Sequence, residues 1–163
     1  GGDVLKAIHD QFKDRFQCEF HGFDANPAIL DYAKAYFQQA HYHECNVVHD
    51  PASIQNFDVV IMNLFAHHFD EHTLDQLVVN LKSQNNKWLI INDLHRHYVP
   101  YYLILFATQL LSNSSMVKND APLSVLRGFK KHELARIPKK ASVNHQITWH
   151  WPFKWLATTQ LIF

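Results

Sequence analysis

"CEFHGFDANPAILDYAKAYFQQA", residues 18–40, predicts a strand, a tight turn and a helix in direct succession. The strand is expected over CEFHGFD. The helix is expected over NPAILDYAKAYFQQA, because Asn26 suits the N-cap and Pro27 suits the first helical position. The apolar stripe expected on this helix consists of Ile29, Ala33, Tyr36, Phe37 and Ala40. A strand followed at once by an amphipathic helix is the repeating unit of α/β proteins.

The same alternation continues on both sides of this stretch. Upstream, Val4, Leu5, Ile8, Phe12 and Phe16 recur at helical spacing directly after two glycines. Downstream, the pattern predicts strands over 44–50, 57–63 and 87–93, and helices over 73–83 and around 101–111. The fold class predicted from this order is α/β, a doubly wound and mostly parallel sheet with helices on both sides.

The end of the chain departs from the alternation. HQITWHW (145–151) and WLATTQLIF (155–163) are two strand patterns joined by the short turn PFK, so they predict an antiparallel hairpin at the edge of the sheet. The stretch SNSSMVKNDAPLS (112–124) has the composition of a long loop.

Composition and charge narrow the classes of function. The length suits one domain, expected over 1–163, and 15 basic residues against 15 acidic ones give no surplus for binding nucleic acid. Thirteen histidines show no metal-ligand spacing. The apolar run 99–111 is too short to span a bilayer and predicts a buried or substrate-facing helix. Cys18 and Cys45 lie in apolar runs, so we expect buried thiols and a cytoplasmic protein.

Polar residues follow the predicted strands at one edge of the sheet. Gly1 and Gly2, just before a helix, suit the back half of a glycine-rich turn, and Asp24 ends the next strand. A carboxylate there can accept both hydroxyl hydrogens of an adenosine ribose, whereas an unpaired buried carboxylate would be costly. Asp50 ends the following predicted strand, where it can reach an adenine amino group. The pattern predicts a nucleoside site at this edge.

With these motifs the chain resembles the class I S-adenosylmethionine-dependent methyltransferases, which have a Rossmann-like fold. GGDVLKAI resembles the tail of the family's glycine motif, so we expect an N-terminal truncation that removes the first, central strand and leaves an unstable fragment. The resemblance implies S-adenosylmethionine as cofactor. It assigns ribose contacts to GFDANP, adenine contacts to HDPASI and methionine contacts to the fourth-strand motif; the residues implied are Gly1, Gly2, Asp24, Ala25, Asn26, Asp50, Pro51, Asn63 and Leu64.

The segment NDLHRHYVPYY (92–102) adds polar and aromatic residues at the same edge. With APLSVLRGF it resembles bacterial small-molecule methyltransferases of the general quinone-biosynthesis type, which implies a small, apolar or aromatic acceptor. His68 and His95 are the candidate general bases, because histidine titrates nearest neutral pH. The candidate substrate contacts are His67, Asp93, Arg96, Tyr101 and Tyr102.

Several of these assignments have alternatives. Asp93 and Arg96 suit a loop-anchoring ion pair as well as a substrate role, and the aromatic helix suits plain core packing. The expected reaction is methyl transfer to an oxygen or carbon of the acceptor. A methyltransferase-like domain without activity, or an oxidoreductase using a nicotinamide cofactor, would carry many of the same residues. The C-terminal hairpin favours methyl transfer, because a dinucleotide dehydrogenase is expected to continue with parallel units.

Overall fold

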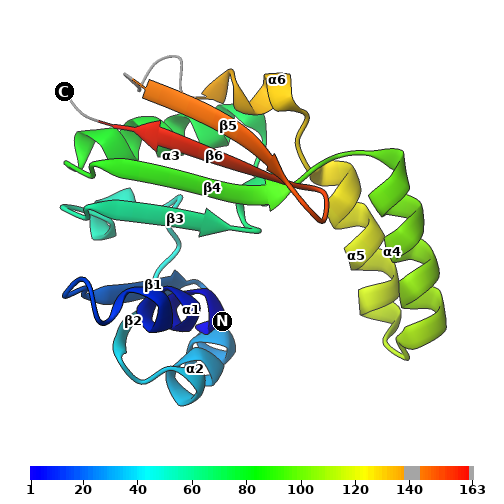
Figure 1. The fold of residues 1–163 in the computed structure, drawn as a ribbon, viewed down its shortest axis with the longest axis horizontal. Helices are drawn as coiled ribbons and strands as arrows, with labels where there is room; N and C mark the ends of the chain where they lie inside the picture. Colours follow the sequence, from blue (N-terminus) through cyan, green and yellow to red (C-terminus); the bar gives the residue numbers. More distant parts are fainter. Residues whose placement is uncertain (138–143, 162–163) are drawn as a thin grey trace. The chain divides into compact units, whose positions relative to one another are not determined.

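A computed structural model of the chain describes residues 1–137 and 144–161 (Figure 1). It divides into two compact units, Gly1–Ile54 and Gln55–Phe163, and each is described by itself. The α/β class predicted from the sequence is confirmed. The prediction that residues 1–163 form one domain stays a prediction.

The first unit is built on two short parallel strands. Its elements are α1 (Asp3–Phe12), β1 (Phe20–Asp24), α2 (Pro27–Tyr36), β2 (Ala40–Glu44) and the 3-10 turn η1 (Pro51–Ser53). The strands pair in register from Phe20 beside Ala40 to Asp24 beside Glu44, so both carboxyl ends finish at the same level. The strand predicted over 44–50 lies earlier, at Ala40–Glu44, and residues 45–50 are not strand, because the pairing with β1 ends at Glu44.

Helix α2 follows the sequence closely at its start and less closely on its buried face. The Asn26 side chain accepts a hydrogen bond from the Ala28 N–H at 3.0 Å, and Pro27 occupies the first helical position, as predicted. Leu30 and Ala33 are buried, but Ile29 and Tyr36 are exposed. The predicted apolar stripe is therefore confirmed at Ala33 and Phe37, which are buried, and wrong at Ile29 and Tyr36, because Leu30 rather than Ile29 enters the core.

The second unit is built on a mixed four-stranded sheet in the order β3-β4-β6-β5. Its elements are β3 (Val59–Asn63), η2 (Ala66–His68), α3 (Glu71–Ser83), β4 (Trp88–Leu94), α4 (Tyr98–Leu111), α5 (Ser115–Arg127), α6 (Lys131–Leu134), β5 (Asn144–His150) and β6 (Lys154–Gln160). β3 and β4 run parallel, and the predicted antiparallel hairpin of β5 and β6 is confirmed, with β6 next to β4. The final two residues of the predicted last strand lie outside the described residues.

The two faces of this sheet differ in burial. Alternate residues such as Leu89, Ile91 and Ala157 are buried, and with the buried side of α3 they make up the core of the unit; the α3 residues are Leu74, Leu77, Val78 and Leu81. The opposite face carries Val59 and Ile61, which remain exposed. The alternation is the period-2 pattern of strands buried on one side.

Three further expectations are corrected. The predicted loop 112–124 lies largely within α5, whose N-cap Ser114 accepts from the Val117 N–H and which accommodates Pro122. The apolar run 99–111, expected to form a buried or substrate-facing helix, makes up most of α4, and only Pro100 of this helix is buried. No described helix is long and apolar enough to cross a bilayer. Both cysteines are free thiols, but Cys18 is exposed and Cys45 half-buried, because both lie outside the strands.

Candidate functional site

In the first unit, Asp24 lies at the carboxyl end of β1 with part of its carboxylate uncommitted. Its Oδ1 accepts a hydrogen bond from the Asn26 N–H at 2.8 Å. Its second oxygen makes no hydrogen bond within the described part of the chain. Glu44 lies beside Asp24 in the strand register, a second acidic residue that sequence reasoning missed although it ends the neighbouring strand. The end of this small sheet therefore offers free carboxylate acceptors.

Gly2 precedes α1 in a backbone conformation that favours glycine. Its φ is 88°, in the left-handed region, and it forms the N-cap of the helix. A Cβ atom at this position would lie 3.2 Å from the Ala33 carbonyl oxygen and 3.2 Å from the Tyr42 hydroxyl. The chain therefore passes close to α2 and β2 here, and a side chain would strain this approach.

The remaining residues predicted to contact the nucleoside lie in short turns. Asp50 is exposed and is the N-cap of η1, which Pro51 begins. The Asp50 carbonyl accepts from the Ser53 hydroxyl at 2.8 Å, so the turn is fixed through its backbone, and no hydrogen bond of the described residues uses the Asp50 carboxylate. Ala25 is exposed between Asp24 and the capping residue Asn26.

In the second unit, two asparagines meet at the carboxyl ends of β3 and β4. Asn63 and Asn92 are register partners, and the Asn92 amide donates to Asn63 Oδ1 at 2.7 Å. Leu64 follows with a φ of 50°, and its N–H donates to the Asn92 carbonyl at 2.8 Å. Sequence reasoning missed Asn92. Its place beside Asp93 in a buried strand was the available signal.

Asp93 and His67 form a buried pair next to these asparagines. Asp93 is fully buried, and its carboxylate accepts from the Leu94 N–H at 2.7 Å, the His67 N–H at 3.1 Å and His67 Nδ1 at 2.7 Å. Because an ionised carboxylate only accepts, His67 Nδ1 is the donor in this contact when Asp93 is ionised, and a neutral His67 then has its lone pair on Nε2. His67 Nε2 has no hydrogen-bond partner among the described residues. This is the tautomer that a general base requires.

His68 follows His67 with its ring tilted against the His67 ring at 4.3 Å between centroids. Burial, followed by the charge of His67, lowers the pKa of His68, and Asp93 opposes this shift. A lowered pKa keeps the imidazole neutral at physiological pH. The structure thus brings together His67, His68 and Asp93, three of the residues predicted from sequence.

His95 and Arg96 lie beyond the end of β4 in different surroundings. The Trp149 indole N–H donates to His95 Nδ1 at 3.3 Å, and burial, followed by His97, lowers the pKa of His95. Since Nδ1 accepts, the proton of neutral His95 lies on Nε2, and this tautomer is a donor rather than a base. Arg96 forms an ion pair with Glu133, so the alternative pairing of Asp93 with Arg96 is not formed.

Tyr101 and Tyr102 lie in the first turns of α4, with ring centroids 5.1 Å apart in an edge-to-face arrangement. Tyr101 is half-buried and Tyr102 is exposed. No hydrogen bond fixes either hydroxyl among the described residues, so both remain available to a ligand.

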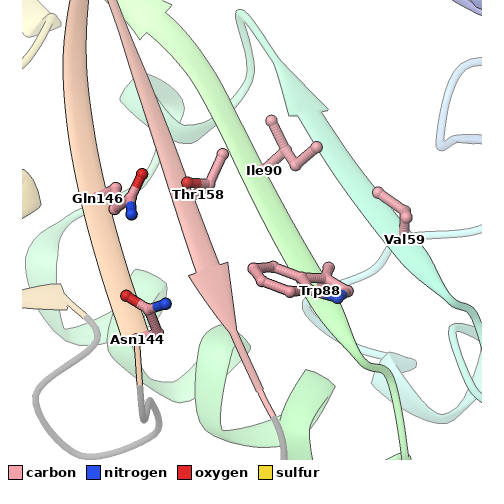
Figure 2. Close-up of a pocket in the computed structure, with 6 residues that line it drawn as sticks. All are labelled: Val59, Trp88, Ile90, Asn144, Gln146 and Thr158. Carbon is pink, nitrogen blue, oxygen red and sulfur yellow. The ribbon is translucent and has the colours of Figure 1, made fainter.

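A hollow of about 460 Å³ lies elsewhere on the second unit (Figure 2). It covers the less buried face of the sheet and is lined by Val59, Trp88, Ile90, Asn144, Gln146 and Thr158. Val59 and Trp88 begin their strands, whereas Asn63 and Asp93 lie near the opposite ends. The hollow is therefore separate from the polar residues at the carboxyl ends. The described residues include no group of three or more side chains arranged to hold a metal ion.

Comparisons with known proteins agree with this fold. A family model described as a methyltransferase domain matches residues 1–84. No curated protein matches the chain. A structure described as a pericyclic reaction enzyme aligns with a TM-score of 0.67 and 14% identity over 99% of this chain, which spans 40% of that protein's length.

Two structures of methyltransferases are also similar. The plantazolicin methyltransferase BpumL, solved with a desmethylPZN analog and SAH, aligns with a TM-score of 0.73 and 12% identity over 99% of this chain and 73% of its own. Human N-acetylserotonin methyltransferase, solved with SAM, aligns with a TM-score of 0.67 and 11% identity over 99% of this chain and 45% of its own. At these identities the likeness concerns the fold.

Proposed function

Since the chain belongs to the family of methyltransferase domains, we propose that it transfers a methyl group from S-adenosylmethionine to an oxygen or carbon of a small, apolar or aromatic acceptor. The observation that carries the proposal is the pairing of His67 with buried Asp93, which leaves an imidazole nitrogen ready to take a proton. The antiparallel hairpin of β5 and β6 favours this reaction over hydride transfer, because a dinucleotide dehydrogenase is expected to continue with parallel units.

The residues of the first unit fit the adenosine part of this cofactor. The uncommitted oxygen of Asp24 supplies an acceptor for ribose hydroxyls, and the Asp50 carboxylate is available to the adenine amino group. Gly2 is the N-cap of α1, and the backbone N–H groups at the start of this helix would suit an anionic group of the ligand. The other predicted cofactor contacts of this unit adjoin Asp24, Asp50 and Gly2 in the sequence; they are Ala25, Asn26, Pro51 and Gly1.

The residues of the second unit suit the acceptor and the methionine part. When bound, the cofactor supplies a methyl group on a sulfonium, which needs an in-line nucleophile. Asn63 and Leu64 would line the methionine part, and their backbone is fixed by the contacts with Asn92. Asp93 holds the His67 ring and its tautomer, and His67 Nε2 accepts the proton of a phenol or enol acceptor.

Aromatic side chains support an apolar or aromatic acceptor. Phe65 packs edge-to-face on Phe69 at 4.9 Å beside the His67 turn, and Tyr101 and Tyr102 begin α4. The wider set of predicted contacts, His68, His95 and Arg96, belongs to the same proposal. His68 and His95 are kept neutral by burial, so they suit hydrogen bonding to the acceptor.

The test is a comparison of histidine variants with S-adenosylmethionine and a panel of phenols and enols. His67→Gln is expected to lower kcat by about 10²–10⁴-fold and to leave the affinity for S-adenosylhomocysteine unchanged, because the proton acceptor is lost whereas a glutamine amide still offers a donor to Asp93. His72→Gln, at an exposed histidine of α3, is the matched control and should keep full turnover. Full activity of His67→Gln would remove the base from the proposal, and absence of cofactor binding by the unmodified protein would remove methyl transfer.

A further inference from the structure

Helix α4 carries apolar residues on the side that faces away from its neighbours. Leu103, Phe106 and Leu110 follow one another at intervals of three and four residues and are 57%, 65% and 82% exposed. The less exposed side of the helix is formed by a different set, Pro100, Ile104 and Thr108. Spacings of three and four place side chains on one stripe of a helix, the pattern of seams in coiled coils and helical bundles. Helix α4 thus has a second apolar seam that the described residues leave largely uncovered.

Helix α5 repeats this arrangement. Met116, Asn119, Leu123 and Leu126 are spaced by three, four and three residues, and all four are exposed. The buried residues of α5 are Pro122 and Val125, which lie on another side of the helix. α4 and α5 lie side by side as a helical hairpin (Figure 1). Both helices therefore present a seam outward, and one seam contains a single asparagine, a residue that fixes register in such bundles.

The uncovered apolar surface is large enough for a stable interface. Nine apolar residues of the two helices are exposed in addition to the proposed substrate contact Tyr102: Tyr98, Leu103, Phe106, Leu110, Leu111, Met116, Val117, Leu123 and Leu126. At roughly 150–200 Å² per side chain of this size, the exposed fractions leave on the order of 1,000 Å² uncovered. A standard interface needs about 800 Å² from each partner, and isolated patches on monomers reach about 300–600 Å².

The charges of the hairpin favour a protein over a lipid surface. α4 has no charged residue, and α5 has Lys118, Asp120 and Arg127. Attraction to anionic lipids takes clusters of about 4–8 lysines and arginines, and interfacial helices have a strongly charged polar face. One acid and two bases instead allow reciprocal pairing across a two-fold axis, where the same patch serves both partners.

We propose that a second copy of this chain docks on the outward seams of α4 and α5, so that two helical hairpins form a four-helix bundle. In this dimer Leu103, Phe106 and Leu110 of each copy interdigitate with the seams of the other copy. The arrangement is isologous and closes after two subunits.

Sedimentation equilibrium of the chain from low to high micromolar concentration tests the proposal. We expect a dimer that the double variant Leu103→Glu/Leu110→Glu weakens by at least about 30-fold, because two buried seam positions become charged. A second variant on the other helix, Met116→Glu/Leu123→Glu, should act alike. All four side chains are exposed in one copy, so the circular dichroism spectrum, and the melting temperature measured where the unmodified chain is also monomeric, should stay unchanged.

The matched control is Val79→Glu, an exposed apolar residue on α3, which should remain dimeric. A monomer at every concentration, or a dimer that both seam variants retain, would overturn the proposal. Flotation of the unmodified chain with phosphatidylglycerol vesicles, lost in both seam variants, would assign the surface to lipid instead. Growth beyond two subunits would overturn the closed bundle.

Discussion

Asp24 and Asp93 arise from the same sequence pattern and lie in opposite environments. Each lies near the carboxyl end of a strand followed by a turn and a helix. Asp24 is half-buried and has one carboxylate oxygen committed to the Asn26 N–H. Asp93 is fully buried, and three N–H groups donate to it. The pattern thus predicts where an acidic residue lies, and burial decides whether it is free for a ligand or holds its neighbours.

The largest difference should appear in stability. Asp93→Ala leaves two buried N–H groups and one part-buried N–H group without an acceptor, so we expect the free energy of unfolding to fall by about 3 kcal/mol. Asp24→Ala should change it by less than about 0.5 kcal/mol, because the lost bond is exposed. Urea unfolding followed by circular dichroism measures both. Equal costs for the two variants would break the comparison.

For cofactor affinity, we expect Asp24→Ala to have the larger effect of the two variants. Asp24→Ala is expected to weaken binding of S-adenosylhomocysteine by about 10–100-fold, because hydrogen bonds between ribose hydroxyls and a charged acceptor are lost. Asp31→Ala, which removes an exposed carboxylate of α2, is the control and should bind normally. Titration calorimetry gives the constants. Unchanged affinity in Asp24→Ala would remove this residue from the proposed site.

Backbone conformation is the second constraint in the unit that contains Asp24. Gly2→Ala should cost about 1–2 kcal/mol of stability, because φ at this position is 88° and the added Cβ meets the Ala33 carbonyl. Gly2→Asn should cost less, since asparagine tolerates this region better. Thermal unfolding of both variants tests the order, and an asparagine variant worse than the alanine variant would contradict it.

The smallest effect concerns pH in the unit that contains Asp93. The pKa of His68 is lowered in the folded protein, mainly by burial. The unfolded chain therefore binds the proton more readily, so stability is fully present above about pH 6.5 and falls as the pH drops toward the folded pKa. His68→Gln should flatten part of this fall between pH 7.5 and 5. The same slope with and without His68 would show that its burial has no such effect.

The sequence predicted repeating local features well and distant partners poorly. The Asn26 cap, the strand over 57–63 and the C-terminal hairpin follow from residue type and spacing within a few positions. The pairing of His67 with Asp93 joins residues 26 apart. No local spacing shows that Asp93 pairs with His67 rather than with Arg96.

For helix α5, the local composition itself led to a wrong prediction. Its Ser, Asn and Pro residues have the composition of a loop, yet Ser114 caps a helix and Val125 is buried. Packing overrides propensity in such a segment. The exposed seam of α4 was also missed, because a continuous apolar run does not show in its sequence which face of the helix packs against the rest of the protein.

The division into two compact units has a spectroscopic consequence. All four tryptophans, Trp88, Trp149, Trp151 and Trp155, lie in Gln55–Phe163, and Gly1–Ile54 contains no tryptophan. Indole emission therefore reports on the unit with the four-stranded sheet, whereas far-ultraviolet dichroism sees the helices of both. Two transitions that fail to coincide during denaturation would show the units melting separately, and coincident ones would show cooperative unfolding of the chain.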